Sequence, residues 1–522
     1  MVRHSSSLFI LYFLLQATII ICQPSQNMKK MAQVAGMPGN EYNDVWGYVA
    51  PDGKEYAIIG STMAVNIFDV TNCSAPVLKY QFVDGLTSSN YWRDFKCFGN
   101  YVYGVADTGT EGLEIFNLTN VNNITVTQNT SHFNRAHNIY VDVANARLYV
   151  AGAHDNSSTN NWMIIYSLSN PGNPTLLKKV SLNTLPGMSG FENLYIHDLY
   201  VENNIAYCSQ GEAGYVIWDC SDVDNITYLG SLDDGSNYNH SSWKHTQYTS
   251  VDTQYFYVAE EVPIGRPIKI MRTIDNGNGF DLTLMSTFKH PLGAPTYTNN
   301  RPHNPYVKDN GLYIAYYHDG IQVYDVIDPL HPIRVAYYDT YPNNNGSNYT
   351  GYQGAWGVYP YLPSGCIIAG DITYGLVTLK THFPKVEFNG PIHLTAPGSG
   401  IVFRDSISNY KKMFVGNDGK IQSLNLTLPD AAYKVDTADV ELLHPANIYL
   451  TATNGTTYKV SISNNGTLTA VQQTAPAQAV RMPGNFLISQ LHRGLIMSTA
   501  NGRRYKTTIS SGGLIKTYLT SF

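Results

Sequence analysis

Histidines recur at the start of β-type segments along this chain, and they are the residues best suited to chemistry. The segments read "RAHNIYVD", "YIHDLYV", "KHTQYTSVD" and "PHNPYVKD". Aligning the chain on these segments gives seven equivalent positions: Trp46, Arg93, His137, His197, His245, His303 and Trp356. Acidic residues recur in the turns after the next predicted strand: Asp107, Asp155, Glu212, Glu260, Glu261, Asp319 and Asp371. Imidazoles and carboxylates that meet at one point suit Zn²⁺ or Mn²⁺, or Ca²⁺ where oxygen ligands dominate.

Three interpretations of these residues compete. The metal-site hypothesis takes six of them as candidate ligands: His137, His197, His245, His303, Asp107 and Asp371. A structural interpretation holds that aligned polar residues of a repeat bond to the neighbouring unit and to water. A catalytic interpretation is the third, but the sequence contains no nucleophile elbow and we assign no catalytic residue.

A second repeat shows which elements must position these side chains. A small residue, alternating apolar residues and usually an aromatic residue recur about every fifty residues, with equivalent positions at Phe68, Phe116, Tyr166, Trp218, Met271, Tyr324 and Leu379. Each unit has room for four strands, and seven such units predict an all-β chain with a seven-bladed β-propeller. The opening strand of each blade lines the central channel. We therefore expect the aligned residues to meet at one mouth of that channel.

The last blade lacks an outer strand after Gly375–Lys380. The segment Lys29–Ala35 is a spare strand, and we expect it to pair there and close the ring. Five cysteines follow Cys22, and an odd number cannot all pair within one chain. We therefore expect hydrogen bonds, without a disulfide, to join the ends of the ring. The five are Cys73, Cys97, Cys208, Cys220 and Cys366.

The N-terminal residues 1–22 resemble a signal peptide, because two basic residues precede a short apolar run. The net charge of −6 comes without a basic run, which disfavours nucleic acid as a partner, and no later stretch is apolar enough to span a membrane. We expect a secreted glycoprotein. Its candidate N-glycosylation sites are Asn72, Asn117, Asn123, Asn129, Asn156, Asn225, Asn239, Asn345, Asn348, Asn425, Asn454 and Asn465.

We divide the mature chain into a propeller over residues 23–385 and a smaller β domain over residues 386–522. The second part has three hairpin-like repeats, in which Lys412, Lys459 and Lys506 are 47 residues apart. Asn-Gly and Gly-Gly turns between alternating strands are typical of hairpins. The three units predict a trefoil-like or prism-like module.

Several motifs together resemble the choice-of-anchor B family, which is built from LVIVD repeats. They include "YNDVWGYVAPDGKEYAIIGS", "WRDFKCFGNYVYGVAD" and "GAWGVYPYLPSGCIIAGDITYGLVTL", and the similarity covers about residues 40–380. The resemblance implies a secreted or surface-displayed propeller with a variable C-terminal part. It implies no established enzymatic activity.

Two classes of function follow from these patterns. The first is a non-enzymatic extracellular protein that binds a protein, glycan or matrix component through its propeller. The second is a metal-dependent hydrolase or lyase that uses the axial histidines and carboxylates, and the geometry of the site must decide between them. A carbohydrate-binding C-terminal module is a third hypothesis and depends only on the trefoil interpretation.

Overall fold

This computed structural model describes most of the chain from Ser25 to Thr520. The described residues are 25–83, 92–155, 161–188, 195–233, 235, 238–246, 253–289, 300–326, 328–342, 351–383, 385–388, 392–404, 409–426, 433–435, 439–442, 447–477, 479–482, 486–488, 494–499, 503–509 and 514–520. Within these residues the fold is all-β, with a single 3₁₀ turn, η1 (Leu182–Thr184), and no α-helix. The same residues accordingly include no helix with the length and apolarity needed to cross a membrane.

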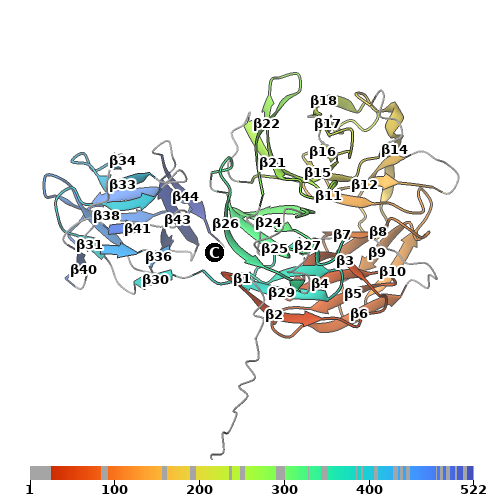
Figure 1. Cartoon of the computed structure of the whole chain (residues 1–522), viewed down its shortest axis with the longest axis horizontal. Helices are drawn as coiled ribbons and strands as arrows, with labels where there is room; N and C mark the ends of the chain where they lie inside the picture. The colour runs from red at the N-terminus through yellow and green to blue at the C-terminus, as the bar shows by residue number, and fades with distance from the viewer. Residues whose placement is uncertain are drawn as a thin grey trace, which may run out of the picture.

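Seven antiparallel sheets make up residues 25–381 (Figure 1). The first four are β3–β6 (Tyr42–Val49, Glu55–Ser61, Ala64–Asp69, Val77–Val83), β7–β10 (Arg93–Phe98, Tyr101–Ala106, Leu113–Asn117, Thr125–Asn129), β11–β14 (Asn138–Asp142, Arg147–Ala153, Trp162–Ser167, Thr175–Ser181) and β15–β18 (Asp198–Glu202, Ile205–Ser209, Tyr215–Asp219, Thr227–Leu232). The fifth is β19–β22 (Asn239–Lys244, Thr253–Glu260, Ile268–Asp275, Phe280–Phe288). The sixth is β23–β26 (Pro305–Lys308, Gly311–Ala315, Ile321–Asp325, Ile333–Tyr338) with β1 (Ser25–Gln26) at its edge, and the seventh is β27–β29 (Ala355–Tyr359, Ile367–Asp371, Gly375–Thr381) with β2 (Met28–Val34).

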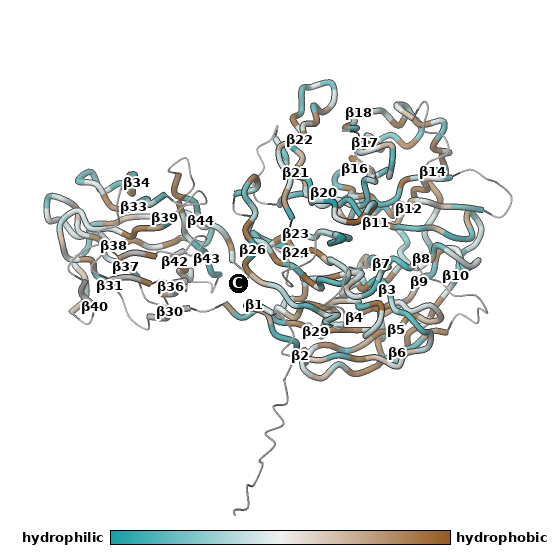
Figure 2. The backbone as a smooth tube through the Cα atoms, in the orientation of Figure 1, coloured by the Kyte–Doolittle hydropathy of each residue, from teal (hydrophilic) through white to brown (hydrophobic). Residues whose placement is uncertain are grey.

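The sheets follow one another in a propeller-like order. First strands of successive sheets lie side by side from β3 through β7, β11, β15 and β19 to β23; β24 lies beside β27, and β27 lies beside β3. Middle strands such as β4 are buried along their whole length because each sheet has a neighbour on both faces. Outer strands such as β6 are largely exposed. Figure 2 shows the hydrophobic stretches along these strands.

The N-terminal strand pairs with the last sheet, as the sequence predicts. β2 runs antiparallel to β29, with Lys29 opposite Lys380 and Val34 opposite Leu376. The expectation that no disulfide joins these ends is wrong, because Cys73 and Cys366 are bonded with a Cα–Cα distance of 5.7 Å. Spacing along the chain conceals this pair, since its members are 293 residues apart. The cysteines at positions 97, 208 and 220 are free thiols.

Residues Lys385–Leu519 form three five-stranded sheets around their own hydrophobic core. Antiparallel pairing confirms the three expected hairpins, β33–β34, β38–β39 and β43–β44. Each sheet combines three antiparallel strands with two parallel ones. Their orders are β34-β33-β32-β41-β35 (Ile421–Leu426, Tyr410–Val415, Ile401–Arg404, Phe486–Ile488, Tyr433–Val435), β39-β38-β37-β31-β40 (Leu468–Gln472, Thr457–Ile462, Ile448–Thr451, Ile392–Leu394, Val480–Met482) and β30-β36-β42-β43-β44 (Lys385–Phe388, Asp439–Leu442, Leu495–Ser498, Arg504–Ile509, Ile515–Leu519).

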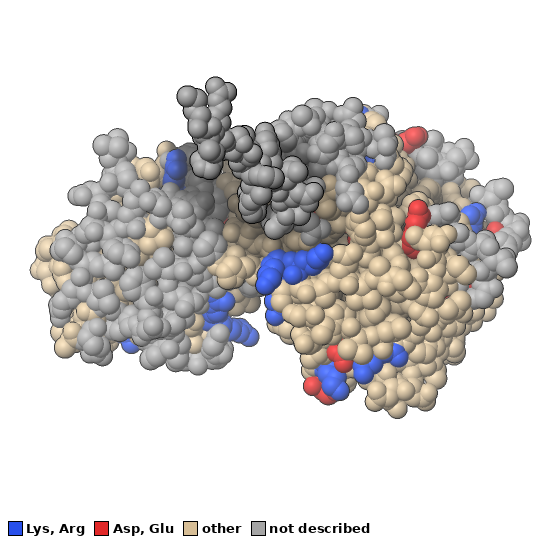
Figure 3. All heavy atoms as spheres, turned by 60° about the horizontal axis from the view of Figure 1, so that its bottom comes forward, with Lys and Arg blue, Asp and Glu red and all other residues tan. Residues whose placement is uncertain are grey.

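The C-terminal sheets lie against the sixth sheet of the propeller-like part (Figure 1). Lys506 Nζ lies 3.8 Å from Asp325 Oδ2, and both side chains are buried. Among the residues that Figure 3 colours, Lys and Arg gather beside the notch between the two parts, and Lys, Arg and acidic side chains lie together at the lower edge of the larger part.

Candidate metal centre at one end of the channel

A line of imidazoles lies where the first strands of four successive sheets begin. Ring centroids are 4.2 Å apart from His137 to His197, 4.2 Å from His197 to His240 and 4.4 Å from His240 to His303. The ring of Trp356 follows at 4.5 Å from His303. We call the seven equivalent residues the histidine layer: Asn43, Arg93, His137, His197, His240, His303 and Trp356.

Two of the predicted members of this layer are wrong. His245 lies beyond the end of β19, where it is buried and its Nε2 lies 2.8 Å from the carbonyl of Val326. His240 takes the predicted place of His245. Trp46 is three residues too far along its strand, and Asn43 occupies the equivalent position. Arg93 is placed as predicted, but its guanidinium is buried in an ion pair with Glu114 at 3.2 Å.

Pairing is irregular at the entrances of both strands. The β19–β20 register shifts between Asn239 and Ser241, so His240 is the extra residue of a bulge. The β3–β4 register shifts between Tyr42 and Val45, which includes Asn43. Bulges add a residue and redirect its side chain. A similar shift lies between Ala355 and Gly357 in the seventh sheet, where the sequence places Trp356 correctly. The two errors therefore come from aligning on the wrong residues: His245 follows the end of β19, and Trp46 lies three residues after Asn43.

The same feature explains why the recurring segments open with a polar pair. Asp198 is opposite Ser209 in the β15–β16 ladder, and the preceding His197 N–H donates to the carbonyl of the same Ser209. Two consecutive residues thus face one partner. The second residues of these pairs form a polar layer directly below the histidines: Asp44, Asp94, Asn138, Asp198, Ser241, Asn304 and Gly357.

Below the polar layer, strand alternation brings large side chains together. Tyr200 lies 5.2 Å from Trp243, Trp243 lies 4.8 Å from Tyr306, and Trp46 lies 4.9 Å from Tyr359, between ring centroids. This aromatic layer fills the channel beneath the polar residues. Its members are Trp46, Lys96, Tyr140, Tyr200, Trp243, Tyr306 and Tyr359.

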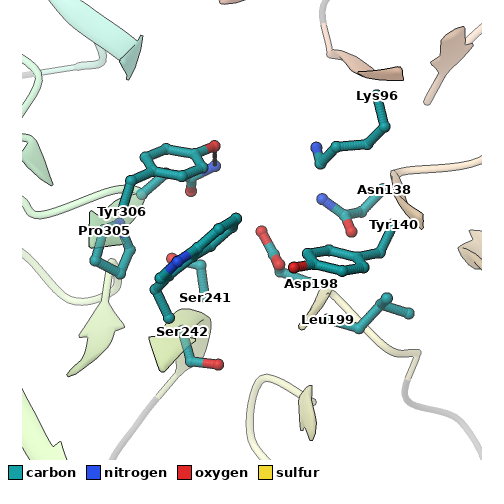
Figure 4. A pocket seen from close by; sticks show the side chains of 11 residues that line it. Lys96, Asn138, Tyr140, Asp198, Leu199, Ser241, Ser242, Pro305 and Tyr306 are labelled. Carbon is teal, nitrogen blue, oxygen red and sulfur yellow. Dashed lines mark hydrogen bonds between the residues drawn. The ribbon is translucent and has the colours of Figure 1, made fainter. Parts of the chain in front are cut away.

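A small cavity lies between the polar and aromatic layers (Figure 4). Its volume is about 10 Å³, close to the minimum that one water molecule needs. Lys96 bonds Asp94 there at 2.6 Å. Burial raises the pKa of Asp198 to about 7, with a contribution from the charge of Asp94. Burial and Asp94 also raise the pKa of Asp44.

The closest grouping of potential metal ligands is in the histidine layer. One ligand atom each from His197, His240 and Glu261 lies within 4.8 Å of the others, and all three residues are buried. The His240 Nε2 atom lies 3.6 Å from Glu261 Oε2, and Tyr317 Oη donates to the other carboxylate oxygen at 2.6 Å. Two imidazoles and one carboxylate form a ligand set that Zn²⁺ uses in proteins.

Hydrogen bonds fix the orientation of the histidine rings. His197 Nδ1 lies 3.0 Å from the carbonyl of His240, and His303 Nδ1 lies 2.6 Å from the carbonyl of Trp356. A carbonyl only accepts, so each Nδ1 carries the proton and donates it. The Nε2 lone pair of each ring is left available, as in metal-binding histidines that donate their other nitrogen to a carbonyl.

Burial also keeps these imidazoles in the form that binds metal. It holds the pKa of His197, His240 and His303 well below the usual value, with neighbouring histidine charges acting in the same direction. They are therefore neutral at neutral pH. A metal ion would not have to displace protons from them.

Several buried polar atoms on residues adjoining the centre have no hydrogen-bond partner among the described residues. They are Ser209 Oγ, Asn239 Oδ1, and both amide atoms of Gln210. Ser209 is bonded to His197 through the backbone, and Asn239 is paired with Gly211. Buried polar groups of this kind normally bond protein, water or an ion. Their concentration here supports a hydrated or metal-bound site.

Four other acidic residues that the sequence places near the axis have partners outside the cluster of His197, His240 and Glu261. Asp107 Oδ2 lies 3.2 Å from His137 Nδ1. Burial alone lowers the pKa of His137, but the contact with Asp107 and the charges of Asp107, Asp198 and Glu261 together outweigh burial and raise the pKa. Asp371 accepts backbone N–H bonds from Thr373 and Tyr374 in its own turn. Glu260 is paired with Lys269, and Asp155 with Lys179.

Two residues that the sequence did not assign to the metal therefore belong to the centre. Glu261 is one of the recurring acidic turn residues in the sequence, but it is not among the six predicted ligands. His240 was overlooked, although "NHSSW" has the spacing from His to Trp that "HNIY", "HDLY" and "HNPY" have from His to Tyr. Asn239, a predicted glycosylation site, is only 5 % exposed and unsuited to carrying a glycan in the folded protein. Asn156, Asn345 and Asn348 lie outside the described residues.

No family model matches this chain, and the curated proteins contain no match to it. The resemblance to the choice-of-anchor B family therefore stays a prediction.

Proposed function

We propose that this protein is an exported seven-bladed β-propeller that binds a divalent transition metal at the histidine end of its channel. It acts outside the cell by binding a protein, glycan or matrix component, without turnover. The observation that carries the proposal is the cluster of His197, His240 and Glu261. Zn²⁺ or Mn²⁺ fits better than Ca²⁺, because two of the three ligands are imidazoles.

The cysteine pairing supports export. A disulfide between Cys73 and Cys366 persists in an oxidising compartment and is rare in a reducing one. Candidate glycosylation sites that are exposed in turns and outer strands agree with the same route: Asn72, Asn123, Asn225, Asn425, Asn454 and Asn465.

Binding without turnover is favoured by how enclosed the centre is. The Glu261 side chain is 11 % exposed and the His240 side chain 3 %. Structural metal sites are closed, whereas catalytic ones keep a position for water and substrate.

A metal-dependent hydrolase or lyase is the second candidate, and one observation favours it. His137 lies beside His197 and is oriented by Asp107, which is how a general base is held next to a reacting group. In that case His137 would serve as the general base, and a metal held by His197, His240 and Glu261 would supply Lewis-acid activation.

Elemental analysis of the purified secreted protein tests the proposal. We expect about one equivalent of Zn²⁺ or Mn²⁺ per chain, because the part of the chain that the structure describes offers one three-ligand cluster. His240→Ala and Glu261→Gln should lose the metal, and His197→Ala and His303→Ala should lower metal content or stability. His331→Ala is the matched control, since His331 is exposed and pairs only with Asp328 in its own turn. Metal-free wild-type protein, even after incubation with Zn²⁺ or Mn²⁺, would contradict the proposal.

Activity assays separate the two candidates. Hydrolysis of ester and phosphoester substrates that is lost in both His137→Gln and His240→Ala would establish the enzyme. Full metal occupancy without such activity supports binding alone.

A further inference from the structure

A fourth set of equivalent residues lies two positions before the histidines. These are Arg135, Tyr195, Tyr238 and Arg301, which precede His137, His197, His240 and His303. Residues two apart on an extended strand point to the same side. The four side chains are therefore expected over the histidine layer, with the two arginines at its ends. We call these four residues the row. The equivalent residues of the first and seventh sheets, Glu41 and Gly354, are not counted in it.

Ring contacts place the two tyrosines over the imidazoles. Tyr195 lies 5.8 Å from both His137 and His197, and Tyr238 lies 5.2 Å from His197, between centroids. Their hydroxyls are 3.4 Å apart. The tyrosines thus form an aromatic cover across the middle of the row, between the two cationic ends.

Arg301 connects to the proposed metal centre through Tyr317. The guanidinium lies 3.8 Å from the ring of Tyr352 and 6.0 Å from that of Tyr317. Tyr317 in turn donates its hydroxyl proton to the ligand Glu261. The Tyr317 ring also lies edge-on against His303 at 5.0 Å.

The Arg301 Nη1 atom is buried and has no hydrogen-bond partner in the described part of the chain. A buried charged donor without an acceptor is costly. Guanidinium groups are suited to carboxylate, sulfate and phosphate, which they bind with two parallel hydrogen bonds. Stacking on Tyr352 holds the plane of the group, so it is prepared for a planar pair of oxygens.

Arg135 stands at the other end of the row and is exposed. Its Nη1 donates to the backbone carbonyl of Asp107 at 3.4 Å, which is a weak bond. Most of its hydrogen-bonding capacity therefore remains for a ligand. Both ends of the row are cationic in a chain whose net charge is −6.

We propose that the histidine end of the channel binds a ligand with an oxyanion group: a carboxylate, sulfate or phosphate. The oxyanion pairs with Arg301, and Arg135 contributes long-range attraction. This proposal deepens the binding function proposed above by naming the chemistry of the ligand, and the Arg301 pairing can be tested separately from the metal. It narrows the extracellular partner to an acidic glycan or an acidic protein group.

Calorimetric titration with sodium sulfate, sodium phosphate and sodium acetate tests the pairing, using both metal-loaded and chelator-treated protein. We expect Arg301→Gln to weaken binding of the preferred anion by about tenfold or more, because a charge-assisted bidentate pair is lost. Arg301→Lys should fall between wild type and Arg301→Gln. Arg135→Gln should reduce affinity only at low ionic strength, as expected for an exposed charge.

Arg334→Gln is the matched control. Arg334 stacks on Tyr337 at 4.3 Å, as Arg301 stacks on Tyr352, but it lies on the outer strand β26 of the same sheet. The Arg334→Gln protein should bind anions with the affinity of the wild type. Circular dichroism and thermal melting should show that every variant is folded.

The outcomes separate the two proposals. Wild type that takes up neither Zn²⁺ nor Mn²⁺ but still binds an anion through Arg301 overturns the metal site and keeps the oxyanion site. Metal-loaded protein that binds none of the three anions, or binds them equally well in Arg301→Gln, overturns the oxyanion site alone. The preferred anion tells sulfated, phosphorylated and carboxylated ligands apart.

Discussion

The propeller-like part and the C-terminal part are both built from β repeats, but they are closed in different ways. Five of the seven propeller-like sheets take all of their strands from one continuous stretch of chain. Only the sixth and seventh sheets include strands from the N-terminal end of the chain, β1 and β2 respectively. Every C-terminal sheet instead takes parallel strands from other repeats, as β32 pairs with β41 and β31 with β37 and β40.

This difference has consequences for stability and for function. The propeller-like ring depends on one closure point, where β2 and the disulfide join the last sheet to the first. The C-terminal sheets are interlocked along their whole length and need no disulfide. A ring also brings one residue from each unit to a common axis, where units can diverge to form a site.

The largest effect should come from removing the closure strand. Deletion of residues 25–34 leaves the edges of β26 and β29 unpaired, and unpaired edges promote association between chains. We expect loss of the propeller-like unfolding transition and formation of soluble aggregates, measured by scanning calorimetry and light scattering. A folded monomer with an unchanged transition would contradict a closed ring.

A core substitution in the C-terminal part should act on that part alone. Phe403 is fully buried in β32 within the C-terminal hydrophobic cluster. Phe403→Ala should lower the free energy of unfolding of this part by about 3–5 kcal/mol, because buried apolar surface is lost and a cavity remains. Two calorimetric transitions are expected, with only the one assigned to the C-terminal part lowered. An equal shift of both would mean that the two parts unfold together.

Opening the disulfide should have a smaller effect than deleting β2. The double substitution Cys73→Ser and Cys366→Ser removes a crosslink that restricts the unfolded chain. Loss of such a crosslink typically lowers the free energy of unfolding by about 2–4 kcal/mol. Chemical denaturation monitored by tryptophan fluorescence measures the change. The control is Cys97→Ser, which removes a thiol that forms no disulfide and should shift the midpoint much less.

The smallest expected effect depends on pH. Burial raises the pKa of Asp371 to about 6, above roughly 4 in an unfolded chain. The ionised carboxyl therefore destabilises the fold by a free energy that is near zero below about pH 4, grows as the pH rises from about 4 to 6, and is constant above that range. Relative to wild type, the free energy of unfolding of Asp371→Asn should rise over this interval by roughly 2–3 kcal/mol. A difference that does not change between about pH 4 and 6 would show that the group is not buried as described.

Much of the fold could be predicted because it is periodic. The repeat of apolar residues ending in an aromatic residue correctly placed the third strand of each propeller-like unit. The spare segment Lys29–Ala35 was correctly assigned to the last unit, since an unpaired final strand requires a partner. The three C-terminal hairpins followed from turn residues, which act locally. Parallel pairing between C-terminal repeats had no local signal.

The candidate site was predicted less well for a physical reason. His137, His197 and His303 were placed correctly because their segments share one spacing. In the first and fifth units another Trp or His stands close by in the sequence, and the alignment selects Trp46 and His245 instead of Asn43 and His240. Glu261 becomes a candidate ligand only because its turn lies against His240.

The sequence by itself determined the repeat, the strands and the kinds of side chain available to the channel. Strand periodicity and turn chemistry are short-range properties that residue order specifies. Only the tertiary structure decided which side chains meet: the disulfide across 293 residues, the cluster of His197, His240 and Glu261, and the placement of Arg301 beside Tyr317. These contacts depend on strand register and on how neighbouring sheets face each other. His240 and His245 stand near the two ends of one short strand, and only the pairing of β19 shows which of them reaches the histidine layer.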